Sequence, residues 1–204
     1  MNKQMKAFLV AAALTGGISG TSNASDLSSM TIKDRASVVA NESMKCMTIY
    51  GMLGEAAVGD DFSTHILNSQ ATFMSTVHIM SSPEETKEEI VERYLMGYEF
   101  TRGAMKNQYD INPGLLVDTL YQCEGWREDL VKHIAANKDL LEGYKTDFDM
   151  RSFYQRMPHP KKEYSLEGAT KGELLSFVMK GMSELERRGV FEQDGIDTIP
   201  NPFN

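Results

Sequence analysis

The cysteines are the residues of this sequence whose spacing predicts a covalent link. Cys46 and Cys123 are the chain's two cysteines, and each lies near the middle of a predicted helix, on its apolar stripe. In an up-down-up-down bundle these two helices are antiparallel neighbours, so their midpoints meet. We expect a disulfide, which by the chain-entropy model would stabilise the folded protein by about 4–5 kcal/mol. Two buried free thiols are the alternative, because cysteine packs well as a small hydrophobe.

Histidine and methionine side chains suggest a second kind of chemistry. The chain has 14 methionines, and Met74 precedes His78 by about one helical turn, with Met80 close behind. Thioether and imidazole groups together suit copper, especially Cu(I). Methionines at helical spacing also serve as core filler. A copper site at Met74, His78 and Met80 is therefore an alternative function, while the leading interpretation needs no cofactor.

Known catalytic patterns are missing from the sequence. It contains no Gly-x-Ser-x-Gly elbow, no phosphate-binding Gly-rich loop and no His-Glu-x-x-His zinc motif. Asp147 and Asp149 are two residues apart, so on a helix they would not share a face. We therefore expect a protein without enzymatic activity, and keep an envelope hydrolase as a further alternative.

Aromatic and arginine side chains are the candidate binding residues, because tryptophan, tyrosine and arginine dominate the energetics of protein interfaces. A lone tryptophan near a disulfide is most often a core residue. The candidates lie on the third and fourth predicted helices and are Tyr94, Tyr98, Arg102, Tyr121, Trp126 and Arg127.

The N-terminus has the pattern of a secretory signal peptide. Lys3 and Lys6 precede the apolar run 7–14, and a plausible cleavage site follows at Ala24. We expect residues 1–24 to be removed and the protein to be periplasmic or secreted. No other run is long and apolar enough to cross a bilayer, so stable membrane insertion is not expected.

The net charge bears on the kind of partner. The chain carries a formal charge of −8, and removal of the signal peptide makes it more acidic. Such a protein would repel the phosphates of nucleic acid. We expect the partner to be another protein, either basic or with an apolar patch, and the chain itself to be a monomer or homodimer.

The helices that position these residues follow from apolar stripes and capping signals. Ser82, Pro83 and Glu85 resemble a capping box that opens the third helix. Asn112 caps the fourth helix, with Pro113 at its first position. Gly97 and Gly103 in the third helix suggest the close approach of a neighbour. The predicted helices are 31–57, 61–80, 83–107, 113–137, a short one at 147–157, and 170–188.

One stretch resembles known families. The run Tyr94-Leu95-Met96-Gly97-Tyr98, then Gly103, then a helix with a central cysteine, is similar to small disulfide-bonded periplasmic proteins, namely the HdeA-type acid-stress chaperones and the Rap1a-type immunity proteins. The resemblance covers residues 89–136. It implies an envelope protein that acts by binding another protein.

These observations predict an all-α bundle of four to six helices with one interhelical disulfide. The helical domain spans residues 25–189, and residues 190–204 form an extended tail. The expected function is that of an exported, non-enzymatic protein-binding factor of the bacterial envelope: an inhibitor, an immunity protein or a chaperone-like protein.

Overall fold

The computed structural model describes residues 32–57, 59, 65–66, 69–70, 72–74, 76–77, 86–139, 153, 156–158, 164 and 170–193, with side chains from residue 38 onward. These ranges contain helices α2 (Ile32–Ala56), α4 (Lys87–Ile111), α5 (Pro113–Ala136) and α8 (Lys171–Arg187), and the 3₁₀ turn η2 (Val190–Glu192). Within them there is no β-strand. The predicted all-α fold with one disulfide is confirmed. The predicted signal peptide, residues 1–24, lies outside the described residues.

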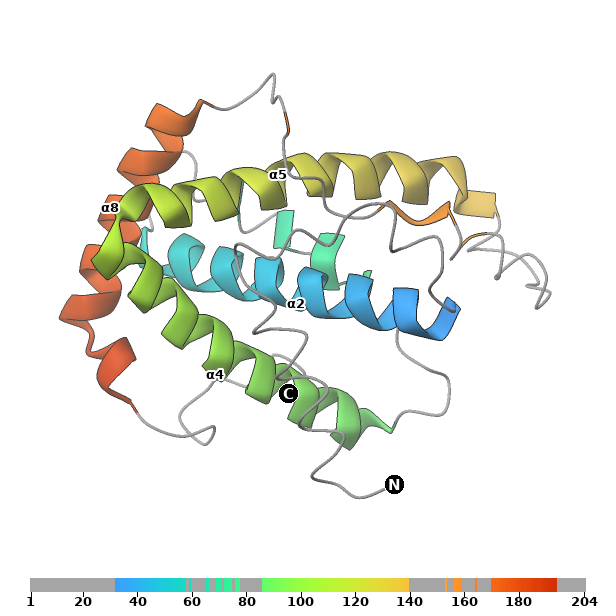
Figure 1. The fold of residues 1–204 in the computed structure, drawn as a ribbon, viewed down its shortest axis with the longest axis horizontal. Helices are drawn as coiled ribbons and strands as arrows, with labels where there is room; N and C mark the ends of the chain where they lie inside the picture. The colour runs from blue at the N-terminus through green and yellow to red at the C-terminus, as the bar shows by residue number, and fades with distance from the viewer. Residues whose placement is uncertain are drawn as a thin grey trace.

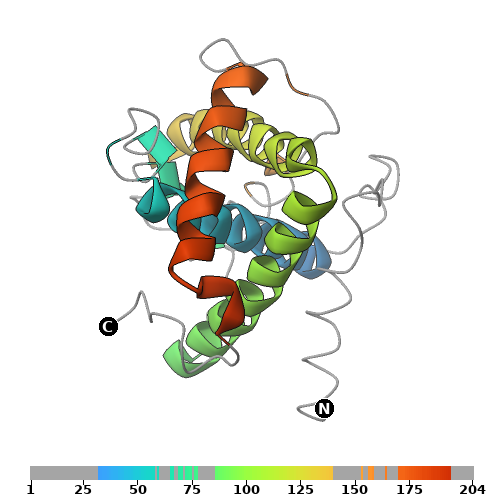
Figure 2. The ribbon, with the colours of Figure 1, turned by 90° about the vertical axis from the view of Figure 1, so that its left-hand side faces the viewer.

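Helix α2 is the central element. Its side chains from Val39 to Ala57 are buried almost throughout, with the charged residues as the main exceptions. Helices α4 and α8 pack against α2, and both also pack against α5. Figure 1 shows α5 running antiparallel to α2, as predicted. Helix α8 departs from an up-down bundle, because it crosses the ends of α2 and α5 instead of running alongside them (Figure 2).

The start of α4 corrects a sequence prediction. The helix begins at Lys87, and its capping box is formed by Thr86 and Glu89 rather than by Ser82 and Glu85. The Thr86 hydroxyl accepts a hydrogen bond from the backbone N–H of Glu89 at 3.2 Å, and the Glu89 carboxylate accepts one from the N–H of Thr86 at 3.1 Å. Two acceptors then satisfy two N–H groups that a helix start otherwise leaves unpaired.

The junction of α4 and α5 is a single residue. Helix α4 continues to Ile111, although the sequence predicted that it would end at residue 107. Asn112 ends α4 and also caps α5, since its side-chain oxygen accepts from the N–H of Gly114 at 2.9 Å. Pro113 occupies the first helical position, where its missing N–H costs nothing. The predicted cap at Asn112 is thus confirmed, and the predicted turn before it is helix.

Helix α8 agrees with its predicted bounds. Thr170 and Glu173 form a second capping box, and the helix ends at Arg187 with Arg188 as its C-cap. Gly189 follows, and its φ of +67° is the left-handed conformation that glycine adopts readily. The next three residues form η2, although the sequence predicted an extended tail from residue 190. Partly buried Val190 and Phe191 pack against the core and explain this turn.

Two predicted helices fall largely outside the described residues. Those residues of 61–80 that the structure describes are helical, and they include Ile66 and Phe73, both fully buried. From the predicted segment 147–157, Phe153 and Arg156 are helical. Phe73 lies between α2 and α5, with its ring 5.4 Å from Tyr50 and 5.6 Å from Trp126.

Candidate functional site

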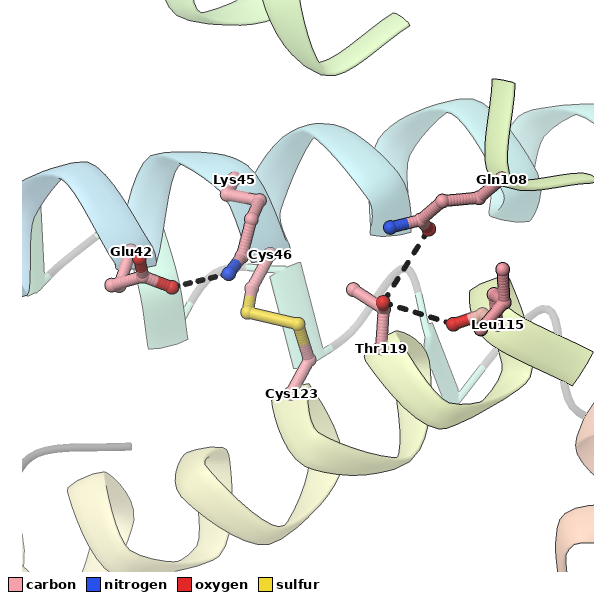
Figure 3. Close-up of polar contacts among 7 residues, drawn as sticks. All are labelled: Glu42, Lys45, Cys46, Gln108, Leu115, Thr119 and Cys123. Atoms are coloured by element: carbon pink, nitrogen blue, oxygen red, sulfur yellow. Dashed lines mark hydrogen bonds and ion pairs between the residues drawn. A yellow bond between two sulfur atoms is a disulfide. The ribbon is translucent and has the colours of Figure 1, made fainter. Parts of the chain in front are cut away.

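The disulfide joins the middle of α2 to the middle of α5. Cys46 and Cys123 are bonded, their Cα atoms are 5.6 Å apart, and each is 2% exposed. Figure 3 shows the bridge spanning the gap between the two helices. In the same view Thr119 donates to the carbonyl of Leu115 at 3.0 Å, one turn from the bridge on α5. The predicted disulfide is confirmed, and its burial shields it from thiol exchange.

A buried carboxylate lies beside this bridge. Glu124 follows Cys123 on α5, and its side chain is 4% exposed. One oxygen, Oε1, accepts a hydrogen bond from the hydroxyl of Tyr50 on α2. The other, Oε2, lies 2.9 Å from Nε2 of His65 and 3.2 Å from a guanidinium nitrogen of Arg127. We call these four residues the Glu124 cluster; it links α2, α5 and the segment that contains His65.

Burial governs the chemistry of the Glu124 cluster. Burial, together with the adjacent Glu124 carboxylate, raises the pKa of Tyr50 well above its ordinary value, so the phenol stays protonated and donates. Tyr50 is fully buried, whereas the His65 side chain is 43% exposed. The imidazole and, to a smaller extent, the 17% exposed Arg127 side chain therefore reach solvent, whereas the carboxylate and the phenol form a buried link between α2 and α5.

Trp126 and Arg127, predicted as binding residues, make internal contacts. Trp126 is 1% exposed, and its indole N–H donates to the carbonyl of Pro158 at 2.9 Å. Arg127 is partly buried, and its guanidinium group pairs with the carboxylate of Glu124 at 3.2 Å. Gly125, the residue before Trp126, packs so closely against Tyr164 that an added Cβ would lie 2.1 Å from the ring. Pro158 and Tyr164 therefore contact this part of α5.

The other predicted binding residues are distributed over α4 and α5. Tyr94 is buried, its ring centre lies 6.0 Å from that of half-buried Tyr98, and burial raises the pKa of both phenols. Buried Arg102 donates to Glu99 and to the backbone carbonyl of Gln193, which follows η2. Tyr121, on α5, lies under the ammonium group of Lys171, 5.4 Å from the ring centre. The structure does not gather these side chains into one exposed surface.

Exposed apolar side chains instead lie on one face of α8, next to the end of α4. Leu175 and Met179 are 41% and 44% exposed, and their spacing of one helical turn places them on one face of α8. The hydroxyl of Tyr109 donates to the sulfur of Met179 at 3.6 Å, so the end of α4 contacts this face. We call Tyr109, Leu175 and Met179 the corner surface.

Charged side chains surround the corner surface. Asp110 pairs with Lys106 at 2.5 Å, and Lys106 also lies 3.3 Å from Glu186 on α8. At the other end of α8, Lys171 pairs with Asp118 at 2.5 Å. The three acids are 42–53% exposed, so their charges are accessible to solvent and to an approaching partner. This rim carries three acidic and two basic groups.

Sequence reasoning missed both arrangements. The spacing of apolar residues in the predicted helix 170–188 does not show that Leu175 is exposed, because it does not reveal how α8 packs on its neighbours. The Glu124 cluster left a weak signal: with Cys46 bonded to Cys123, Tyr50 lies one turn from the bridge on α2 and Glu124 next to it on α5. The sequence alone does not reveal that these two side chains meet.

The predicted copper ligands are only partly visible. Met74 is half-buried and packs against the core, while His78 and Met80 lie outside the described residues. Among the residues that the structure does describe, no three histidine, cysteine or acidic side chains come together as a metal site would require. The copper site stays a prediction.

Comparisons with known proteins identify no family for this chain. A scan against protein-family models, a search of curated proteins and a search of solved structures each found no match. The resemblance to HdeA-type and Rap1a-type proteins therefore stays a prediction. None of the described helices combines the length and apolarity that crossing a bilayer requires.

Proposed function

We propose that this protein is an exported, non-enzymatic factor of the bacterial envelope that binds another protein through the corner surface, as an inhibitor, immunity protein or chaperone-like protein would. The observation that carries the proposal is the exposure of two large apolar side chains, Leu175 and Met179, on one face of α8 that Tyr109 at the end of α4 contacts. Contiguous exposed apolar groups with a polar rim are typical of protein interaction sites.

The scaffold beneath the corner surface suits such a role. Helices α4 and α5 are joined by the single residue Asn112, so there is no flexible loop at the junction. Helix α8 is held against α2 and α5 by its buried side chains, which include Leu174, Phe177 and Met182. A surface that is ordered before binding loses less conformational entropy on association, which favours affinity.

Charge supports a basic partner. The chain carries a formal net charge of −8, and the rim of the corner surface contains the exposed acids Asp110, Asp118 and Glu186. Exposed ion pairs such as Asp118–Lys171 contribute at most about 1 kcal/mol, so a partner's lysine or arginine can replace the intramolecular lysine at little cost. Complementary charges of this kind accelerate association and make it sensitive to salt.

The test is affinity capture from envelope extract with the mature, disulfide-bonded protein as bait. We expect a partner that the wild type retains, that the double variant Leu175→Ser/Met179→Ser loses, and that added salt weakens. Val131→Ser is the matched control, because Val131 is 42% exposed on α5 but is not part of the corner surface. Circular dichroism of each variant checks folding. Equal capture by the wild type and the double variant would contradict the proposal.

A further inference from the structure

The methionines of this chain differ sharply in their access to solvent. In the described part of the chain, Met44, Met47, Met52, Met105, Met157 and Met182 are at most 3% exposed, and Met74 and Met96 are half-buried. Met179 is 44% exposed. It lies less than one turn from Met182 on α8, and Met182 is completely buried. One helix therefore presents one thioether to solvent and hides another.

The exposed thioether also has a specific neighbour. The Tyr109 hydroxyl donates a hydrogen bond to the Met179 sulfur at 3.6 Å. A thioether sulfur is a weak acceptor. A sulfoxide oxygen at the same position is polar and accepts far more strongly. The hydroxyl that now contacts sulfur would then hold the oxidised side chain in place.

We propose that Met179 is a site of reversible oxidation, and that the hydroxyl of Tyr109 donates a hydrogen bond to the oxygen of the resulting sulfoxide. A peroxide is the oxidant: the sulfur attacks one peroxide oxygen, an S–O bond forms and the O–O bond breaks. The sulfur loses two electrons, and the peroxide is reduced to water when hydrogen peroxide is used. Methionine sulfoxide reductases reverse the change. Oxidation converts the centre of the corner surface from apolar to polar.

The consequence for partner binding rests on the proposed function. Met179 and Leu175 together supply the apolar part of α8 in the corner surface. Placing a sulfoxide there would require burying a polar group against the partner, which costs free energy unless the partner provides a donor. An oxidant would therefore release the partner, and reduction would restore binding.

The first measurement follows oxidation site by site. The folded, disulfide-bonded protein is exposed to hydrogen peroxide, quenched over time, digested with trypsin and analysed by mass spectrometry. Cleavage after Lys171, Lys180 and Arg187 separates Met179 in peptide 172–180 from Met182 in peptide 181–187. We expect Met179 to oxidise more than about tenfold faster, because Met182 reacts only in molecules that have opened locally. Equal rates would overturn the proposal.

Two variants test the roles of the sulfur and the hydroxyl. Met179→Leu keeps an apolar side chain of similar volume. Peroxide should therefore shorten retention on a hydrophobic-interaction column for the wild type but not for this variant. Tyr109→Phe removes the hydroxyl that donates to a lone pair of the Met179 sulfur. That lone pair is then free to attack peroxide, so Met179 should oxidise faster while the oxidation rate of Met182 is unaffected. If peroxide shifts both proteins equally, or if Tyr109→Phe leaves the Met179 rate unchanged, the proposal fails.

Partner capture then separates this proposal from the proposed function. Capture after peroxide is expressed for each protein as a fraction of its own untreated capture, because Met179→Leu alters the corner surface itself. If this fraction falls for the wild type, stays near one for Met179→Leu and is restored by the reductase, oxidation of Met179 regulates binding. If the fraction is the same for both proteins, the regulatory consequence fails and the proposed function stands. If neither captures a partner, the proposed function fails, while the oxidation rates still decide the assignment of Met179.

Discussion

Truncation of the buried carboxylate should cost more stability than any other single change in the Glu124 cluster. Glu124→Ala leaves the hydroxyl of Tyr50 without its acceptor and removes the counter-charge of Arg127. Removing one partner of a buried ion pair costs about 3–5 kcal/mol, because the other charge stays desolvated. Domains have a total stability of about 5–15 kcal/mol, so this variant should lose a large share of its free energy of unfolding.

The rest of the cluster gives a graded series. Tyr50→Phe keeps the ring and leaves Oε1 of Glu124 without a donor; a hydrogen bond to a charged group contributes about 1.5–3 kcal/mol. His65→Ala should cost less than about 1 kcal/mol, because the 43% exposed imidazole is screened by water that can replace it. The expected order of destabilisation is Glu124→Ala, then Tyr50→Phe, then His65→Ala.

Urea unfolding followed by fluorescence measures this series directly. Trp126 is the only tryptophan in the chain, it is 1% exposed, and it lies two residues from Glu124. The free energy of unfolding is obtained by linear extrapolation with the disulfide intact. If the three variants agree within about 0.5 kcal/mol, the solvent-screening argument fails. If His65→Ala is the most destabilised, the buried link is not the feature that stabilises the pair of helices.

Three further perturbations test other parts of the fold. Reduction of the disulfide, whose cysteines are separated by 77 residues, should lower stability by about 4–5 kcal/mol in urea titrations with and without dithiothreitol. Gly181→Ala should lower Tm, because its Cβ would lie 2.9 Å from Cδ2 of Leu53, whereas Gly103→Ala, with nothing within 4 Å, should raise stability by up to about 1 kcal/mol. Burial lowers the pKa of His133 below its ordinary 6.5, so the unfolded chain binds a proton more readily and stability falls as pH drops below about 6.5. The difference in unfolding free energy between pH 7 and pH 5 should be smaller in His133→Gln, and an unchanged difference would contradict this.

Local signals in the sequence were sufficient for the helices and for the covalent link. Asn112–Pro113 marks the start of α5, and the cysteines at the middle of two apolar stripes pair as expected. The predicted start of α4 was wrong, because the sequence offers two capping boxes with the same spacing. Ser82 and Glu85 are the earlier pair, but α4 begins after the later pair, Thr86 and Glu89.

The site could be predicted less well, because it depends on how helices cross. The same aromatic and arginine residues can be core or interface, and Trp126 and Arg102 are core. Gly97 does meet a neighbour, Met44, whereas Gly103 is open to solvent. The spacing of apolar residues alone assigns Leu175 to the apolar side of α8. In the structure α8 packs on its neighbours so that Leu175 is 41% exposed to solvent.

Arg102 has a consequence for the handling of this protein. Its guanidinium group, 6% exposed, donates to the main-chain carbonyl of Gln193, far along the chain from α4. A protease that trims the chain to a point before Gln193 would strip this acceptor from a desolvated cation and loosen the attachment of η2. Affinity tags and fusion partners therefore belong downstream of Gln193.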